Sequence, residues 1–139
     1  MTLPYDEAQL LPLSSDRDIE HRVADLIGRA NSRQLWLLFL DEGDVQLPIL
    51  IPIEGLPFEP TDEQAGQVIS RVGELMDEIG ATSVITVLER YGSPALSLHD
   101  AAWARSLRRG FDDRGIVLRA QLLSHRTGVR LIIDDDCTA

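Results

Sequence analysis

The chain has 139 residues, enough for one domain with a sizeable core and too few for two. Its 23 acidic and 13 basic residues give a net charge of −10, which disfavours nucleic-acid binding because such a surface repels phosphate groups. All 13 basic residues are arginine, which excludes Schiff-base catalysis, pyridoxal phosphate anchoring and the lysine of a P-loop.

Residues 1–15 contain two prolines and no periodic pattern, which predicts an extended N-terminal arm. This start lacks the basic residues of a secretory signal peptide, and no apolar run approaches the roughly 20 residues of a membrane span. The single cysteine, Cys137, cannot form an intramolecular disulfide and lies in an acidic tail over residues 134–139. We therefore expect a cytoplasmic protein with one domain over residues 16–133.

The first predicted helix runs from about Asp16 to Ala30, where apolar residues recur at three- and four-residue spacing. Ser15 and Asp18 at its start resemble a capping box.

Two predicted strands follow this helix. The run Gln34–Leu40 is apolar on both faces, which predicts a buried strand. The run Leu47–Ile53 alternates around Pro48 and Pro52, which remove N–H donors along one side and therefore predict an edge strand.

The second predicted helix begins at Thr61, which forms a capping box with Gln64, and it ends at Gly80. It is followed by a strand over Ser83–Leu88 and by a loop over residues 89–96 that is rich in turn-forming residues.

The third predicted helix covers Ser97–Asp113. A last pair of strands, Ile116–Leu123 and Val129–Ile133, surrounds a turn at residues 126–128. The order helix, hairpin, helix, strand, helix, hairpin predicts an α/β fold with three layers and a mixed five-stranded sheet. Two helical crossovers should each place strands in parallel pairs.

The segment from Val87 to Asp100 resembles the metal-binding loop of the JAB/MPN family, most closely its RadC-like bacterial branch. That family carries His-x-His, seven residues, Ser, two residues and Asp. Here Glu89 stands in place of the second histidine, and Ser97 and Asp100 follow at the family's spacing. Two further segments, Leu38–Asp41 and 115–118, resemble strand segments of the family. About 100 residues are covered.

The departures from the family pattern concern its metal chemistry. Val87 and Glu89 replace the two histidine ligands, which leaves too few ligands for catalytic zinc. The general-base glutamate of the family would fall near Leu50 or Ile51, and its Asp-His pair becomes Ala120-Gln121. The resemblance thus implies a non-catalytic module, without metal or cofactor, that acts through protein contacts and keeps Val87, Glu89, Ser97 and Asp100 as a degenerate site.

Other interpretations of these residues stay open. Ser97 and Asp100 also form an ordinary capping box, in which the charge of Asp100 contributes roughly 0.3–1 kcal/mol. A small hydrolase or ligand-binding domain could use Glu89, His99 and Asp100 around a remodelled pocket. A purely structural helper of an enzyme is a third interpretation. The histidines, among them His125, lack ligand spacing and are expected at the surface or at helix ends.

Three arginines of the third helix, Arg105, Arg108 and Arg109, form a solvated face or a docking face for an acidic partner of unknown identity. Acidic residues near Asp16 could pair with them in a second copy. Because the net charge makes two copies repel, we expect a monomer or a weak homodimer.

Overall fold

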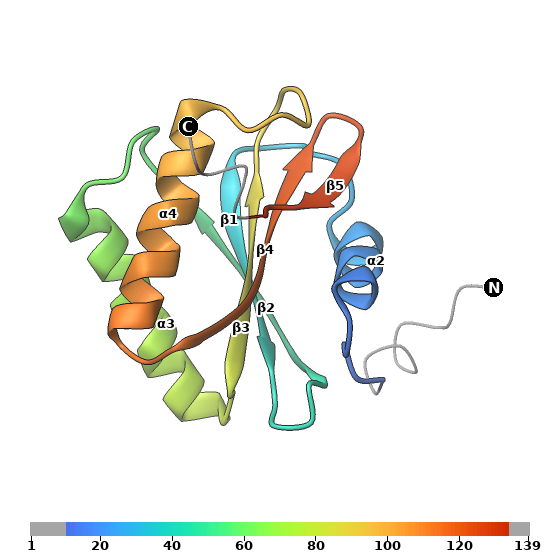
Figure 1. Ribbon diagram of the computed structural model, residues 1–139, viewed down its shortest axis with the longest axis vertical. Helices are drawn as coiled ribbons and strands as arrows, with labels where there is room; N and C mark the ends of the chain where they lie inside the picture. Colours follow the sequence, from blue (N-terminus) through green and yellow to red (C-terminus); the bar gives the residue numbers. More distant parts are fainter. Residues whose placement is uncertain (1–10, 134–139) are drawn as a thin grey trace.

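The computed structural model describes residues 11–133 and confirms the three layers and the mixed five-stranded sheet. One face of the sheet carries two helices and the other face carries one (Figure 1). The elements are α2 (Asp16–Leu26), β1 (Gln34–Leu40), β2 (Gln46–Glu54), α3 (Asp62–Ile79), β3 (Ser83–Glu89), α4 (Leu98–Asp113), β4 (Val117–His125) and β5 (Gly128–Leu131). Most of the predicted arm, residues 1–10, and the predicted tail with Cys137, residues 134–139, lie outside the described residues.

The strand order is β2–β1–β3–β4–β5, and the only parallel neighbours in the described sheet are β3 and β4. The expectation of two parallel pairs is therefore wrong, because β1 lies between β2 and β3 and is antiparallel to both. The outer side of β2 explains this arrangement. Its prolines deny a third strand the donors of a regular ladder, so β3 pairs with the free side of β1 instead.

The prediction that the strand with Pro48 and Pro52 lies at a sheet edge is confirmed. Pro52 is paired with Trp36 of β1, and both prolines are exposed. The ladder with β1 persists because the donors come from the alternate residues of β2.

The core has two parts because both faces of the sheet are covered. Leu35, Leu37 and Phe39 of β1 pack under α3 and α4, whereas Leu38 and Leu40 pack under α2. This arrangement is why β1 is apolar on both faces.

The helix ends follow local signals with one exception. Thr61 and Gln64 form the predicted capping box of α3, and Gly80 ends that helix in the left-handed conformation. Helix α2, by contrast, ends at Leu26 and not near Ala30. Gly28 adopts a φ of 67°, which turns the chain out of the helix before the apolar pattern ends.

One end of the sheet gathers four connections. Because β1 is antiparallel to β2 and β3, and β4 is parallel to β3, the start of β1 lies beside the ends of β2, β3 and β4. The segments at this end are residues 27–33, 55–61, 90–97 and the turn between β4 and β5, at the top of Figure 1. Among residues 11–133, no helix is long and apolar enough to span a membrane.

Candidate functional site

The end of β3 directs consecutive side chains to opposite faces of the sheet. Val87 is fully buried in the cluster under α2, whereas Leu88 belongs to the cluster under α3 and α4. Glu89 follows Val87 to the α2 side, and Arg90 follows Leu88 to the α4 side.

Glu89 is 2% exposed and its carboxylate accepts four hydrogen bonds. Its Oε2 accepts from the backbone N–H groups of Asn31 (2.6 Å) and Ser32 (3.0 Å). Its Oε1 accepts from Gln34 Nε2 (2.7 Å) and Trp36 Nε1 (2.9 Å). Burial alone would raise the pKa of this carboxyl group, but the four donors outweigh burial and lower it. Glu89 therefore fixes the segment before β1.

Arg90 forms a buried ion pair with Asp100 on the other face of the sheet. Its Nε and Nη2 both donate to Asp100 Oδ2, at 2.9 and 2.8 Å. The same guanidinium group donates to the carbonyl oxygens of Ser93 (2.6 Å) and Ala95 (2.8 Å). One buried cation thus joins the start of α4 to the preceding loop.

Asp100 has a larger role than a helix-end charge. The capping box with Ser97 is confirmed, since Ser97 Oγ accepts from Asp100 N and Asp100 Oδ2 accepts from Ser97 N. However, the carboxyl group is 2% exposed and paired with Arg90. Burial alone would raise the pKa of Asp100. The hydrogen bonds from Arg90 and Ser97 and the charge of Arg90 outweigh burial, so the pKa is lowered.

The four residues of the degenerate site do not form one cluster. Ser97 and Asp100 lie together at the start of α4, whereas Val87 and Glu89 lie on the α2 side. The alternative trio of Glu89, His99 and Asp100 is divided in the same way. The β3 residues on the Asp100 side include Thr86 and Leu88. Arg90, directly after β3, places its guanidinium group against the carboxylate.

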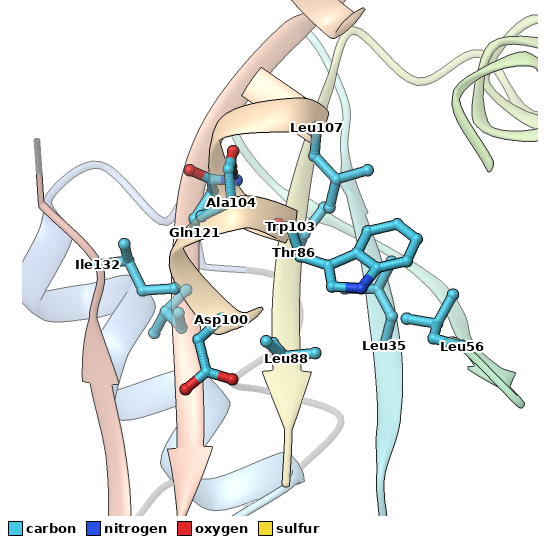
Figure 2. A pocket seen from close by; sticks show the side chains of 11 residues that line it. Leu35, Leu56, Thr86, Leu88, Asp100, Trp103, Ala104, Leu107, Gln121 and Ile132 are labelled. Atoms are coloured by element: carbon cyan, nitrogen blue, oxygen red, sulfur yellow. Dashed lines mark hydrogen bonds between the residues drawn. The ribbon is translucent and has the colours of Figure 1, made fainter. Parts of the chain in front are cut away.

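A small cavity lies under α4, with Asp100 at one end and Leu107 at the other (Figure 2). Its polar lining includes Thr86 and Gln121, whose Nε2 donates to Ala104 O at 2.9 Å. The cavity volume is about 10 Å³. That space holds at most one water molecule, so the cavity is part of the core and is no substrate site.

A much larger groove, of about 560 Å³, lies on the outer side of the loop over residues 90–97, called the groove loop below. It runs between the loop after β2 and the loop after β3, where α/β sheets commonly bind ligands. Its lining residues are Arg33, Phe58, Arg90–Ser93, Ala95–Ser97, His99 and Asp100.

Aromatic side chains stand at the rim of this groove. Phe58 is 65% exposed and Tyr91 is 69% exposed. The Arg33 guanidinium lies over the Phe58 ring, 4.7 Å from its centroid, and the centroid of the tilted His99 ring lies 5.7 Å from that of Phe58. The hydroxyl group of Tyr91 donates to the carbonyl oxygen of Asn31. Sequence reasoning missed both aromatic residues, because single aromatic residues in loops carry no periodic signal.

His99 lines the groove with a partly exposed side chain, and its contacts give it no nucleophile to activate. Its Nδ1 lies 3.6 Å from Glu59 Oε1 in an exposed pair. The nearby hydroxyl groups serve the backbone, since Ser97 Oγ accepts from Asp100 N and Ser93 Oγ from Ala95 N. Among residues 11–133, no three His, Cys, Asp or Glu side chains are grouped to hold a metal ion.

His125 lies beside the groove loop and is buried, which corrects the expectation of a surface histidine. It closes β4, two residues beyond the predicted strand end. Burial lowers its pKa, and the charges of Arg90, Arg130 and Arg126 lower it further. Burial and the charges of three arginines therefore all disfavour the protonated form of this imidazole.

The arginines predicted as a docking face lie on α4, away from this groove. Arg105 and Arg109 are exposed and Arg108 is half-buried. Asp16, considered above as an acid for pairing between copies, forms an ion pair within the chain, because Arg119 Nη1 lies 2.8 Å from its Oδ1. This contact ties α2 to β4.

The sequence was compared with known proteins. No model of a protein family matches this chain, and no curated protein matches it.

Proposed function

We propose that this protein is a non-catalytic, metal-free module that binds another protein through the groove between residues 55–59 and 90–99. One observation carries the proposal. The buried charges at this end of the sheet, Glu89, Arg90 and Asp100, hold loops in place, while apolar side chains at the same end stay exposed. Charged groups held in this way serve to position a surface rather than to transfer protons.

The exposed apolar residues support a binding role. Phe58, Tyr91 and Leu98 are three of the six large apolar side chains exposed within residues 11–133. All three lie at this end of the sheet, Phe58 and Tyr91 in loops and Leu98 as the first residue of α4. Exposed aromatic residues around a concave surface are typical of protein-binding sites. The arginines of α4, Arg105, Arg108 and Arg109, remain a second proposed contact surface, including that of a weak homodimer.

The JAB/MPN resemblance is part of this proposal. The element order and the turn from Ser97 to Asp100 support it, while Val87 and Glu89 lie on the face opposite Asp100. A module of this kind without a metal site would act through its surface. The lone cysteine supports a reducing compartment, and we place the protein in the cytoplasm.

The experiment is a selection from a random library of displayed peptides against the full-length protein. We expect the selected peptides to lose binding to Phe58→Ala and to Tyr91→Ala. Val117→Ala is the matched control, because Val117 is 58% exposed at the opposite end of the sheet. Peptides that bind the two groove variants as well as the parent would overturn the proposal. Circular dichroism of each variant confirms that its fold is kept.

A further inference from the structure

We infer that the groove takes an acidic peptide segment with an apolar anchor residue, although the whole protein is strongly acidic. This inference rests on the proposed function, since it names the chemistry of the partner for that same groove. Three independent features of the groove support it.

The first feature is the local charge. Arg33 lines the groove, and Arg126 and Arg130 belong to the neighbouring β4–β5 hairpin, which contacts the groove loop through Arg126 N and Gly92 O (3.0 Å). Burial lowers the pKa of His125 most, and the charges of Arg90, Arg130 and Arg126 lower it further. The acidic group inside the groove, Asp100, is neutralised by Arg90. The chain has 23 acidic residues, but at this end Arg33, Arg126 and Arg130 offset the exposed carboxylates of Glu54 and Glu59 and supply positive charge beside the groove.

The second feature is the use of hydrogen-bond acceptors. Four consecutive carbonyl oxygens, those of residues 92–95, accept hydrogen bonds from arginine residues. Arg126 N donates to Gly92 O, Arg130 Nε to Pro94 O, and Arg90 to the carbonyl oxygens of Ser93 and Ala95. A ligand rich in donors, such as a lysine-rich peptide, finds these acceptors occupied. A ligand rich in carboxylates can meet the exposed side chain of Arg126, because it is the backbone N–H of this residue, and not its guanidinium group, that donates to Gly92 O.

The third feature is the apolar rim. The rings of Phe58 and Tyr91 and the half-buried side chain of Leu96 offer a surface for one aromatic or aliphatic residue. Arg33 extends this surface, because its guanidinium lies over the Phe58 ring and its Nη2 donates to Pro57 O at 3.0 Å. The arginine is thereby held where it can meet a carboxylate beside the anchor.

These features favour a peptide over a nucleic acid. Arginines and aromatic rings also bind single strands, but a phosphate backbone carries one charge per nucleotide and must approach a protein of net charge −10. The exposed carboxylates of Glu54 and Glu59 flank the groove and would repel a long polyanion. A short peptide places a few carboxylates beside the arginines and none beyond them.

The test uses three synthetic peptides with a central tryptophan flanked on each side by two glutamates, two glutamines or two lysines. Each is titrated into the ¹⁵N-labelled full-length chain and followed by NMR. The net charge alone predicts that the lysine peptide binds best. We expect instead that the glutamate peptide shifts the amide signals of residues 90–97 and binds about tenfold more tightly than the glutamine peptide. Its binding should weaken as salt is raised.

Charge-reversal variants locate the effect. Arg126→Glu keeps the backbone contact to Gly92 and should weaken the binding of the glutamate peptide about tenfold. Arg17→Glu makes the same charge change at the start of α2, far from the groove, and should leave binding unchanged. Equal weakening by both variants would overturn the inference, because it would reflect net charge alone.

Other outcomes separate this inference from the proposed function. A groove that prefers the glutamine or lysine peptide still binds peptides, so only the inference on acidity fails. Tighter binding of a nine-nucleotide single strand than of the glutamate peptide also overturns it. If no peptide, displayed or synthetic, depends on Phe58 and Tyr91, the proposed function fails as well.

Discussion

Glu89 and Arg90 are neighbours in the chain, yet their side chains lie on opposite faces of the sheet and fix different segments. Glu89 binds the segment before β1 on the α2 side, and Arg90 binds the loop before α4 on the other side. The end of β3 therefore fixes the start of β1 with the segment before it, and the start of α4 with the loop before it, through two adjacent buried charges. This arrangement builds the walls of the groove, and it makes the groove sensitive to changes that do not touch a ligand.

Replacing Glu89 by glutamine should lower the free energy of unfolding by about 2–3 kcal/mol. The new amide group would face N–H donors, and the charge that attracts them would be gone. Urea unfolding measures the loss. The indole N–H signal of Trp36 should shift in NMR spectra, whereas that of Trp103, which donates to Pro57 O, should not. Glu54→Gln, at an exposed site, is the control and should cost under about 0.5 kcal/mol.

Asp100→Asn should cost about 3 kcal/mol, well above the roughly 0.3–1 kcal/mol of a helix-end charge. The reason is that the substitution leaves the Arg90 guanidinium charged and buried without its counter-ion. Asp62→Asn provides the comparison, because Asp62 is an exposed acidic residue in the first turn of α3. Equal losses for the two variants in urea unfolding would show that the buried pair contributes nothing beyond the helix end.

Stability should fall as the pH drops below about 6.5, and His125 should account for the fall. Its pKa is lowered from 6.5 by folding, so the unfolded chain takes up a proton more readily than the folded one. The lowered pKa values of Glu89 and Asp100 act in the same direction, but only below their ordinary values of 4.5 and 3.8. Urea unfolding at about pH 7.5 and about pH 5.5 isolates the histidine.

His125→Gln should flatten the change between these two pH values, whereas His21→Gln, at an exposed position on α2, should leave it intact. A full pH dependence in the His125 variant would assign the effect to another group.

Placing histidines at residues 87 and 89 should not create a zinc site that uses Asp100. Both positions lie on the α2 side, and the sheet separates them from the carboxylate. Competition with a chromophoric zinc chelator, after circular dichroism has confirmed folding, measures the affinity. We expect Asp100→Asn to change the zinc affinity of Val87→His/Glu89→His by less than about twofold. A zinc affinity that depends strongly on Asp100 would contradict this prediction and would show that residues 87, 89 and 100 meet as in the JAB/MPN motif.

Much of the fold could be predicted because its signals are local. Pro48 and Pro52 identified the edge strand, and Thr61 with Gln64 identified the start of α3. The position of β3 could not be read in this way. It depends on which strand still has an edge open for pairing, and that is a property of the assembled sheet.

The candidate site was less accessible to sequence reasoning. The four donors to Glu89 come from residues 31–36, more than fifty positions earlier in the chain, so no spacing pattern shows them. Strand parity does contain a usable signal, because it places residues 87 and 89 on one face and residues 88 and 90 on the other. Which of these faces meets Asp100 is decided only by the side on which α4 crosses the sheet.

The prolines of β2 also bear on how this protein could aggregate. A fibre grows when each molecule offers two strand edges, one to accept a neighbour and one to be accepted. Here one edge lacks regularly spaced donors at Pro48 and Pro52. The other described edge, β5, has four residues. Strand-to-strand association through β5 would pair that edge in both molecules and would stop at a closed dimer. The sheet therefore disfavours open-ended polymerisation.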